Sequence, residues 1–144
     1  MSHMQDAEPK SQLVAGCEFL DPILVPRGFT FKIERAGLGS GGAFASGSYS
    51  RADRRLELHF RYSLGLVTYH IGDASLDHES YMRFLGVRDK CSYPDFPKSP
   101  LDSFRSLAID LERFCFDFLV GDGQEFRRMS ASTGLLTHGI SRIS

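Results

Sequence analysis

Apolar and polar residues alternate through residues 43–71, most strictly in the runs R-L-E-L-H-F-R-Y and V-T-Y-H-I. A period of two residues is typical of half-buried β-strands. Breaks at Ala52-Asp53 and Leu64-Gly65 fit short hairpin turns, so this segment predicts three antiparallel strands. Burial then selects the register, because a slip of one residue would move every apolar side chain to the opposite face.

The predicted register divides the side chains of the sheet into two faces. One face is apolar and would form the core, with Leu58, Phe60 and Tyr69 among its members. The other face would be open, and on it His59 would lie opposite His70. The candidate open-face surface consists of Phe44, Ser46, Glu57, His59, Arg61, Thr68 and His70.

The N-terminal third of the chain predicts a helix and a strand. Apolar residues recur every three or four positions from Ser11 to Leu20, as on one face of a helix. Residues 29–35 read F-T-F-K-I-E-R and predict a first strand. The glycine-rich residues 37–42 would then be a flexible connection to the meander.

Two helices are predicted after the meander, which would end at Gly72-Asp73-Ala74. Ser75 would cap the first helix, which would run through Leu85. The second would begin at Ser99-Pro100-Leu101-Asp102, since Ser at the N-cap, Pro at the first position and an early acid favour a helix start. Its apolar stripe continues over residues 100–120 and should be the principal cover of the sheet.

These elements predict an α+β fold with an N-terminal helix, a four-stranded, mainly antiparallel β-meander and two C-terminal helices that cover one sheet face. Residues 124–129 would add a short strand or turn. The single domain would span residues 11–129. Residues 1–10 would be a vector remnant, M-S-H-M, and a disordered N-terminus, and residues 130–144 a flexible C-terminal tail.

Composition narrows the classes of partner. Seventeen basic and 18 acidic residues leave a net charge of −1, so the overall charge requires no polyanionic partner. No apolar run approaches the roughly 20 residues that span a bilayer, and we expect neither a membrane association nor a signal peptide. The cysteines Cys17, Cys91 and Cys115 are odd in number and lack metal-ligand spacing, so we expect free thiols in a reducing cytoplasm.

The pair His59 and His70 is the sharpest candidate site. On facing strands their Cβ atoms would lie about 5 Å apart, with Glu57 beside them. Two imidazoles and a carboxylate could bind Zn²⁺ or act as a general acid and base. A solvated sheet face explains the same residues, because a metal site needs a third ligand and a concave, partly dry setting. The sequence therefore predicts no cofactor, no metal and no catalytic residue.

Other motifs are better explained by local structure. Residues 37–42 match G-x-G-x-x-G, but a strand rather than a helix follows them, so no dinucleotide site is predicted. His78 lies between Asp77 and Glu79, which would be exposed carboxylates near a helix N-terminus. The G-x-S-x-G motif of serine hydrolases does not occur.

Several arginines give the meander a basic end, namely Arg51, Arg54, Arg55 and Arg61. Basic stripes of this kind bind nucleic acids on basic domains. Because this domain is near neutral, an acidic protein partner fits the same residues equally well, and nucleic-acid binding is not expected.

The run F-A-S-G-S-Y-S-R-A-D-R-R-L-E-L-H-F-R-Y-S-L-G-L-V-T-Y-H-I-G, followed by L-D-H-E-S-Y-M-R-F-L-G, is similar to small uncharacterised α+β proteins of bacteria, some of which resemble immunity proteins encoded beside secreted toxins. The resemblance covers residues 28–120 and implies no functional residue. It favours a non-catalytic cytoplasmic protein-interaction module, immunity-like in role, with an unknown partner. A small enzyme or metal-binding protein using His59, His70 and Glu57 is the alternative, and a nucleic-acid-associated accessory protein is a second.

Overall fold

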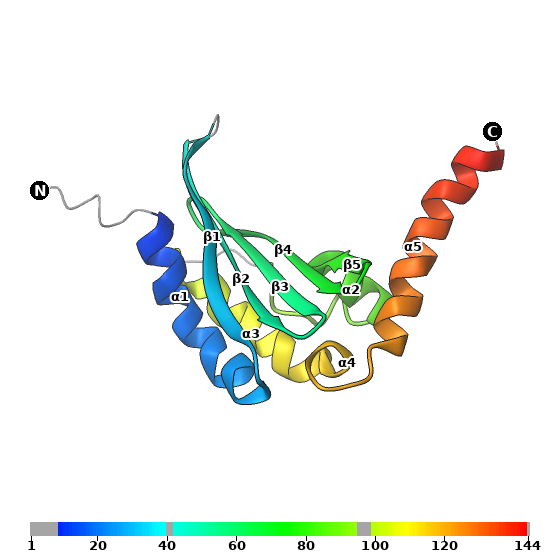
Figure 1. Cartoon of the computed structure of the whole chain (residues 1–144), viewed down its shortest axis with the longest axis horizontal. Coiled ribbons are helices and arrows are strands. Elements are labelled where there is room, and N and C mark those ends of the chain that lie inside the picture. The colour runs from blue at the N-terminus through cyan, green and yellow to red at the C-terminus, as the bar shows by residue number, and fades with distance from the viewer. Residues whose placement is uncertain (1–8, 40–41, 95–98, 144) are drawn as a thin grey trace, which may run out of the picture.

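The computed structural model describes residues 9–39, 42–94 and 99–143, with the side chains of 134–143 left out. Most of the predicted N-terminal remnant therefore lies outside the described residues. The strands are β1 Thr30–Gly39, β2 Gly42–Arg51, β3 Arg54–Phe60, β4 Leu64–Ile71 and β5 Ala74–Asp77. They form one antiparallel sheet in sequence order (Figure 1). The α+β class and the antiparallel meander are confirmed.

A fifth strand differs from the prediction that the sheet ends at residues 72–74. Gly72 takes a positive φ of 60° in a tight turn, and β5 then returns beside β4. Within β5 only Leu76 is buried. Four residues with one apolar position show no alternation that the sequence could reveal.

The register is as predicted between β2 and β3, where Ser46 lies opposite His59. Between β3 and β4 the prediction is wrong by four residues, because Arg55 rather than His59 lies opposite His70. The turn occupies residues 61–63 instead of Leu64-Gly65. A displacement of four residues keeps the paired side chains of β3 and β4 on their predicted faces, so burial of these strands could not exclude it. Tyr62, predicted on the apolar face, lies instead in the turn and is exposed.

A residue outside the β3–β4 hairpin contacts the chain just after its turn. The Tyr93 hydroxyl donates to the carbonyl oxygen of Leu64 at 2.8 Å and also contacts that of Gly65. Leu64 itself is buried at the start of β4. An irregularity between Leu58 and Phe60 adjusts the pairing at this end. A residue almost thirty positions away thus holds the segment that the sequence alone places in a turn.

Five α-helices are described, together with a 3₁₀ turn η2 at Val25–Arg27: α1 Pro9–Leu24, α2 His78–Leu85, α3 Asp102–Phe114, α4 Phe116–Leu119 and α5 Gln124–Ile143. α1 and α3 lie side by side against one face of the sheet (Figure 1). At their crossing Gly16 faces the ring of Phe104, which stacks on Phe60 of β3 with ring centroids 5.9 Å apart. No described helix is both long and apolar enough to cross a membrane.

The C-terminal region differs most from the prediction. The helix expected over residues 100–120 begins at Asp102 and is interrupted at Cys115. Residues 124–129, predicted as a strand or turn, begin α5, which continues through the predicted tail. The Asp117 carboxylate accepts hydrogen bonds from the backbone N–H groups of Gly123 at 3.0 Å and Phe126 at 2.9 Å. α5 is therefore capped from the preceding helix, which no local pattern reveals.

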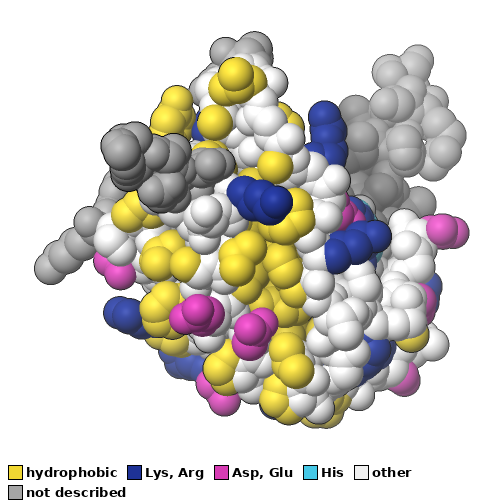
Figure 2. All heavy atoms as spheres, turned by 60° about the vertical axis from the view of Figure 1, so that its left-hand side comes forward, with side chains coloured by type: hydrophobic (Ala, Val, Ile, Leu, Met, Phe, Trp, Pro, Cys, Tyr) yellow, Lys and Arg dark blue, Asp and Glu magenta, His cyan; other side chains and the backbone are white. Residues whose placement is uncertain are grey.

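The two edges of the sheet differ. α5 contacts β5 at one edge, where the Ser130 hydroxyl donates to the Ser75 carbonyl oxygen at 3.1 Å. β1 forms the other edge beside α1, and most of its residues are exposed. Hydrophobic side chains form a band down this side of the molecule (Figure 2). The sheet is thus closed at β5 and accessible at β1.

Candidate functional site

The two histidines of the open face do not form a pair. His59 stacks on Phe44, with ring centroids 5.6 Å apart. His70 lies opposite Arg55, and its Nε2 is 2.9 Å from Oε1 of Glu57. Arg55 and His59 are four positions apart on β3, which is roughly 13 Å along the strand. The prediction that His59 lies opposite His70 is therefore wrong.

A chain of polar contacts crosses the centre of the open face. Glu34 accepts a hydrogen bond from the buried Ser48 hydroxyl at 2.8 Å and pairs with the Arg55 guanidinium at 2.8 Å. Arg55 also approaches Glu57 at 3.5 Å, and Glu57 contacts His70. Hydrogen bonding from Arg55 lowers the pKa of the Glu34 carboxyl below its ordinary value of 4.5. These charges neutralise one another, so this centre offers a partner few free groups.

A second group on this face combines aromatic, apolar and cationic side chains. We call it the distal patch, and it consists of Arg35, Phe44, His59, Arg61, Tyr62 and Leu66. The Arg35 and Arg61 guanidinium carbons lie 5.6 and 5.7 Å from the Phe44 ring centroid. Tyr62 is 74% and Leu66 is 63% exposed. No member is acidic, and the patch joins the turn before β4 to the start of β2.

The other predicted open-face residues lie between these two groups. Ser46 is buried opposite His59, and Thr68 lies opposite Glu57. Glu57, His59 and Thr68 line a shallow pocket of about 240 Å³ together with Leu66. Arg35, Tyr62 and Leu66 of the distal patch were not among the predicted open-face residues.

The arginines of the predicted basic end are largely engaged within the fold. Arg51 Nη1 donates to the backbone carbonyl oxygens of Arg27 and Leu119, each at 2.9 Å. Arg54 Nη2 donates to the carbonyl oxygen of Gly121 at 2.7 Å. These bonds tie the β2–β3 hairpin to the helical layer. Arg61 Nη1 likewise donates to the Gly42 carbonyl oxygen at 2.7 Å, while its guanidinium lies against Phe44 in the distal patch.

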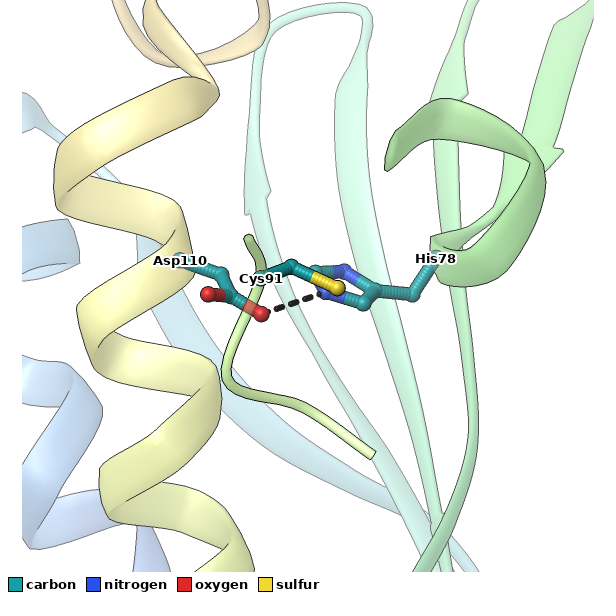
Figure 3. A group of neighbouring side chains, drawn as sticks. All are labelled: His78, Cys91 and Asp110. Atoms are coloured by element: carbon teal, nitrogen blue, oxygen red, sulfur yellow. Dashed lines mark hydrogen bonds and ion pairs between the residues drawn. The ribbon is translucent and has the colours of Figure 1, made fainter. Parts of the chain in front are cut away.

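A buried polar network lies on the other side of the sheet, between β4, α2 and α3 (Figure 3). His78 Nε2 is 2.9 Å from Oδ2 of Asp110, and the side chains are 3% and 0% exposed. The opposite ring nitrogen, Nδ1, is 2.7 Å from the Tyr69 hydroxyl. His78 begins α2 because Asp77, rather than the predicted Ser75, caps the helix through a 2.8 Å bond from Ser80 N–H. Asp77 and Glu79 are exposed as predicted, whereas His78 between them is buried.

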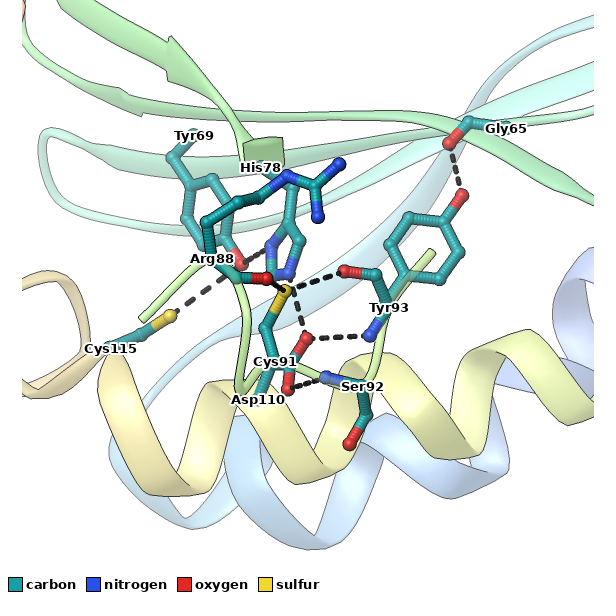
Figure 4. A network of polar contacts seen from close by, with 9 residues as sticks. All are labelled: Gly65, Tyr69, His78, Arg88, Cys91, Ser92, Tyr93, Asp110 and Cys115. Atoms are coloured by element: carbon teal, nitrogen blue, oxygen red, sulfur yellow. Dashed lines mark hydrogen bonds and ion pairs between the residues drawn. The ribbon is translucent and has the colours of Figure 1, made fainter. Parts of the chain in front are cut away.

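Asp110 is the acceptor at the centre of this network (Figure 4). In addition to its contact with His78, the Asp110 carboxylate accepts hydrogen bonds from the backbone N–H groups of Ser92 at 2.6 Å and Tyr93 at 2.8 Å. Cys115 Sγ lies 3.6 Å from the Tyr69 oxygen. One assignment of protons satisfies the chain with a neutral histidine: Cys115 donates to Tyr69, Tyr69 to His78, and His78 to Asp110. A buried carboxylate that accepts three bonds in this way anchors the 88–93 loop to α3.

Cys91 lies beside this pair, and its thiol contacts the carbonyl oxygens of Arg88 and Tyr93, each at 3.3 Å. Burial raises the pKa of Cys91, and it raises that of Cys115 to about 12. Both thiols therefore stay protonated near neutral pH. Because both His78 nitrogens already have partners, the arrangement is not that of an activated cysteine nucleophile.

One feature of the sequence, outside any local motif, points to this network. Asp110 lies between Leu107 and Leu111, on the apolar stripe of α3. A carboxylate in a buried stripe requires a partner, because an isolated buried charge is strongly unfavourable. The pattern thus indicates that a donor is needed, although it does not identify His78.

No model of a known protein family matches the chain, no curated protein matches its sequence, and no solved structure matches its fold. The resemblance to immunity-like proteins thus stays a prediction from the order of elements.

Proposed function

We propose that this protein is a non-catalytic, cytoplasmic protein-interaction module that binds an acidic segment of a partner protein through the distal patch. The observation that carries this proposal is the exposure of Tyr62 and Leu66 beside the Phe44–His59 stack, together with the two arginines that lie over the Phe44 ring. Tyrosine, phenylalanine and arginine are the residues that protein interfaces concentrate.

The charge of the patch supports an acidic partner. Arg35 and Arg61 both lie over the Phe44 ring. Glu57, the carboxylate that lines a pocket with His59 and Leu66, is already paired with His70 and Arg55. A partner carboxylate would meet guanidinium donors, and an adjacent apolar side chain would bury Leu66. The near-neutral charge of the whole chain favours a protein over a nucleic acid.

The buried network supports the absence of catalysis. The buried His78 has partners on both ring nitrogens. The immunity-like role predicted from the order of elements is one form of this function, in which the partner would be a toxin domain.

Selection from a random displayed peptide library tests the proposal. We expect the selected peptides to be enriched in acidic residues next to apolar ones. Tyr62→Ser and Arg35→Ser should each weaken binding of these peptides at least about tenfold, as loss of an interface hot spot does. Phe116→Ser and Arg83→Ser are matched controls on other surfaces, since Phe116 is 69% exposed and Arg83 61%.

Two results would contradict the proposal. Equal losses in the control variants would mean that the peptides bind elsewhere. Tighter binding of a single-stranded oligonucleotide that displaces the peptides would favour the nucleic-acid alternative, because aromatic rings and arginines also stack on bases.

A further inference from the structure

We infer that His78, Cys91 and Asp110 form a binding site for a transition metal of the Zn²⁺ class. Their ligand atoms, one from each side chain, all lie within 4.8 Å of one another. The three residues come from the start of α2, the loop before Tyr93 and the middle of α3 (Figure 3). This site lies on the opposite side of the sheet from the distal patch and does not depend on the proposed function.

The set of donors selects the class of metal. An imidazole nitrogen, a thiolate and a carboxylate oxygen suit Zn²⁺, whereas Mg²⁺ and Ca²⁺ prefer oxygen ligands alone. Bond lengths of 2.0–2.3 Å in a tetrahedral site place ligand atoms about 3.3–3.8 Å apart. His78 Nε2 and Asp110 Oδ2, at 2.9 Å, would have to separate slightly to admit the ion. Cys91 Sγ would be the third protein ligand.

Binding requires a defined movement of protons. The Cys91 thiol releases its proton to solvent when the sulfur bonds the metal. His78 stays neutral, with its proton on Nδ1 instead of Nε2, where the Tyr69 oxygen accepts it. The Tyr69 hydroxyl then turns toward Cys115 Sγ, which lies 3.6 Å away. The outer ring nitrogen of a metal-bound histidine usually donates to such an oxygen, and this bond orients the ligand.

A pocket beside the site supplies an approach for the ion. It has a volume of about 180 Å³ and is lined by His78 together with Tyr93, Asp77 and Glu79. The two carboxylates attract a cation toward the histidine, and the open volume admits water. A fourth ligand from water would complete the tetrahedral set, as in zinc sites with three protein ligands.

Titration of the chelator-treated full chain with Co²⁺ and Zn²⁺ tests this inference. We expect one equivalent of Co²⁺ to give a thiolate-to-metal charge-transfer band, which stoichiometric Zn²⁺ displaces, and Zn²⁺ to slow alkylation of Cys91. Cys91→Ser should abolish the band and weaken Zn²⁺ binding by more than the 10–100-fold typical of lost second-shell groups. Cys17→Ser is the matched control, and the charge-transfer band of this variant should be unchanged.

Removal of the other ligands extends the test. Asp110→Asn and His78→Asn should weaken Zn²⁺ binding similarly, and circular dichroism would show whether each variant folds. Cys91→Ser keeps the inference testable if they do not, because the Cys91 thiol makes only two long contacts to carbonyl oxygens. Absence of the charge-transfer band in the wild type, or loss of metal binding in His59→Ala/His70→Ala with no loss in Cys91→Ser, would overturn the inference.

Discussion

Substitution of Gly16 by alanine tests the packing of α1 on α3. In an isolated helix this change is stabilising by about 1 kcal/mol, because glycine is a poor helix former. In this fold a Cβ at residue 16 would lie 2.4–2.5 Å from three ring carbons of Phe104. The ring is fully buried and stacked on Phe60, so it cannot move aside without disturbing the core.

The magnitude follows from these two opposing effects. Overpacking a well-packed core costs typically about 1–3 kcal/mol. After the gain of about 1 kcal/mol in helix propensity, we expect Gly16→Ala to lower the free energy of unfolding by up to about 2 kcal/mol. Phe104→Ala alone should lower it by about 3–5 kcal/mol. In the Phe104→Ala background the clash is absent, and Gly16→Ala should then raise stability by about 1 kcal/mol. The substitution thus changes sign with the background.

Urea unfolding followed by far-ultraviolet circular dichroism measures all four members of this cycle. The chain has five tyrosines and no tryptophan, and tyrosine fluorescence supplies a second probe. An unchanged denaturant slope would show that the variants unfold from the same native state. If Gly16→Ala stabilises the protein in both backgrounds, the close approach of α1 and α3 is refuted. Phe104→Leu offers a milder partner variant.

Three further predictions concern thiols, acid stability and the core. A thiol reagent in native buffer should label Cys91 first, whereas Cys17 and Cys115 should react slowly, because burial raises the pKa of each to about 12; equal rates would contradict this. Because folding lowers the pKa of Glu34, its stabilisation should be present above pH 4.5 and be lost as the pH falls below 4.5. Glu34→Gln should therefore reduce the acid sensitivity of the free energy of unfolding, as measured by denaturation curves at different pH values. Leu111→Ala should lower the free energy of unfolding by about 2–5 kcal/mol, and a loss under 1 kcal/mol in urea titrations would mean that this stripe of α3 is not core.

Much of the sheet could be predicted from periodicity. The β2–β3 register is as expected because a two-residue turn at Ala52-Asp53 and the alternation of faces leave one pairing. The β3–β4 register differs from the prediction, because displacements by an even number of residues bury the same side chains of the two strands. The contact of Tyr93 with the carbonyl oxygens of Leu64 and Gly65 belongs to the tertiary structure.

The same distinction applies to the candidate sites. Alternation assigned the residues within the strands to a face without reference to register, but it did not indicate that Tyr62 and Leu66 form an exposed patch with Arg35. Only the fold separated His59 from His70 and joined His78 to Asp110, which are 32 residues apart. Periodicity reports whether a side chain is buried, and a buried polar group needs a partner, but the identity of that partner depends on how distant elements pack.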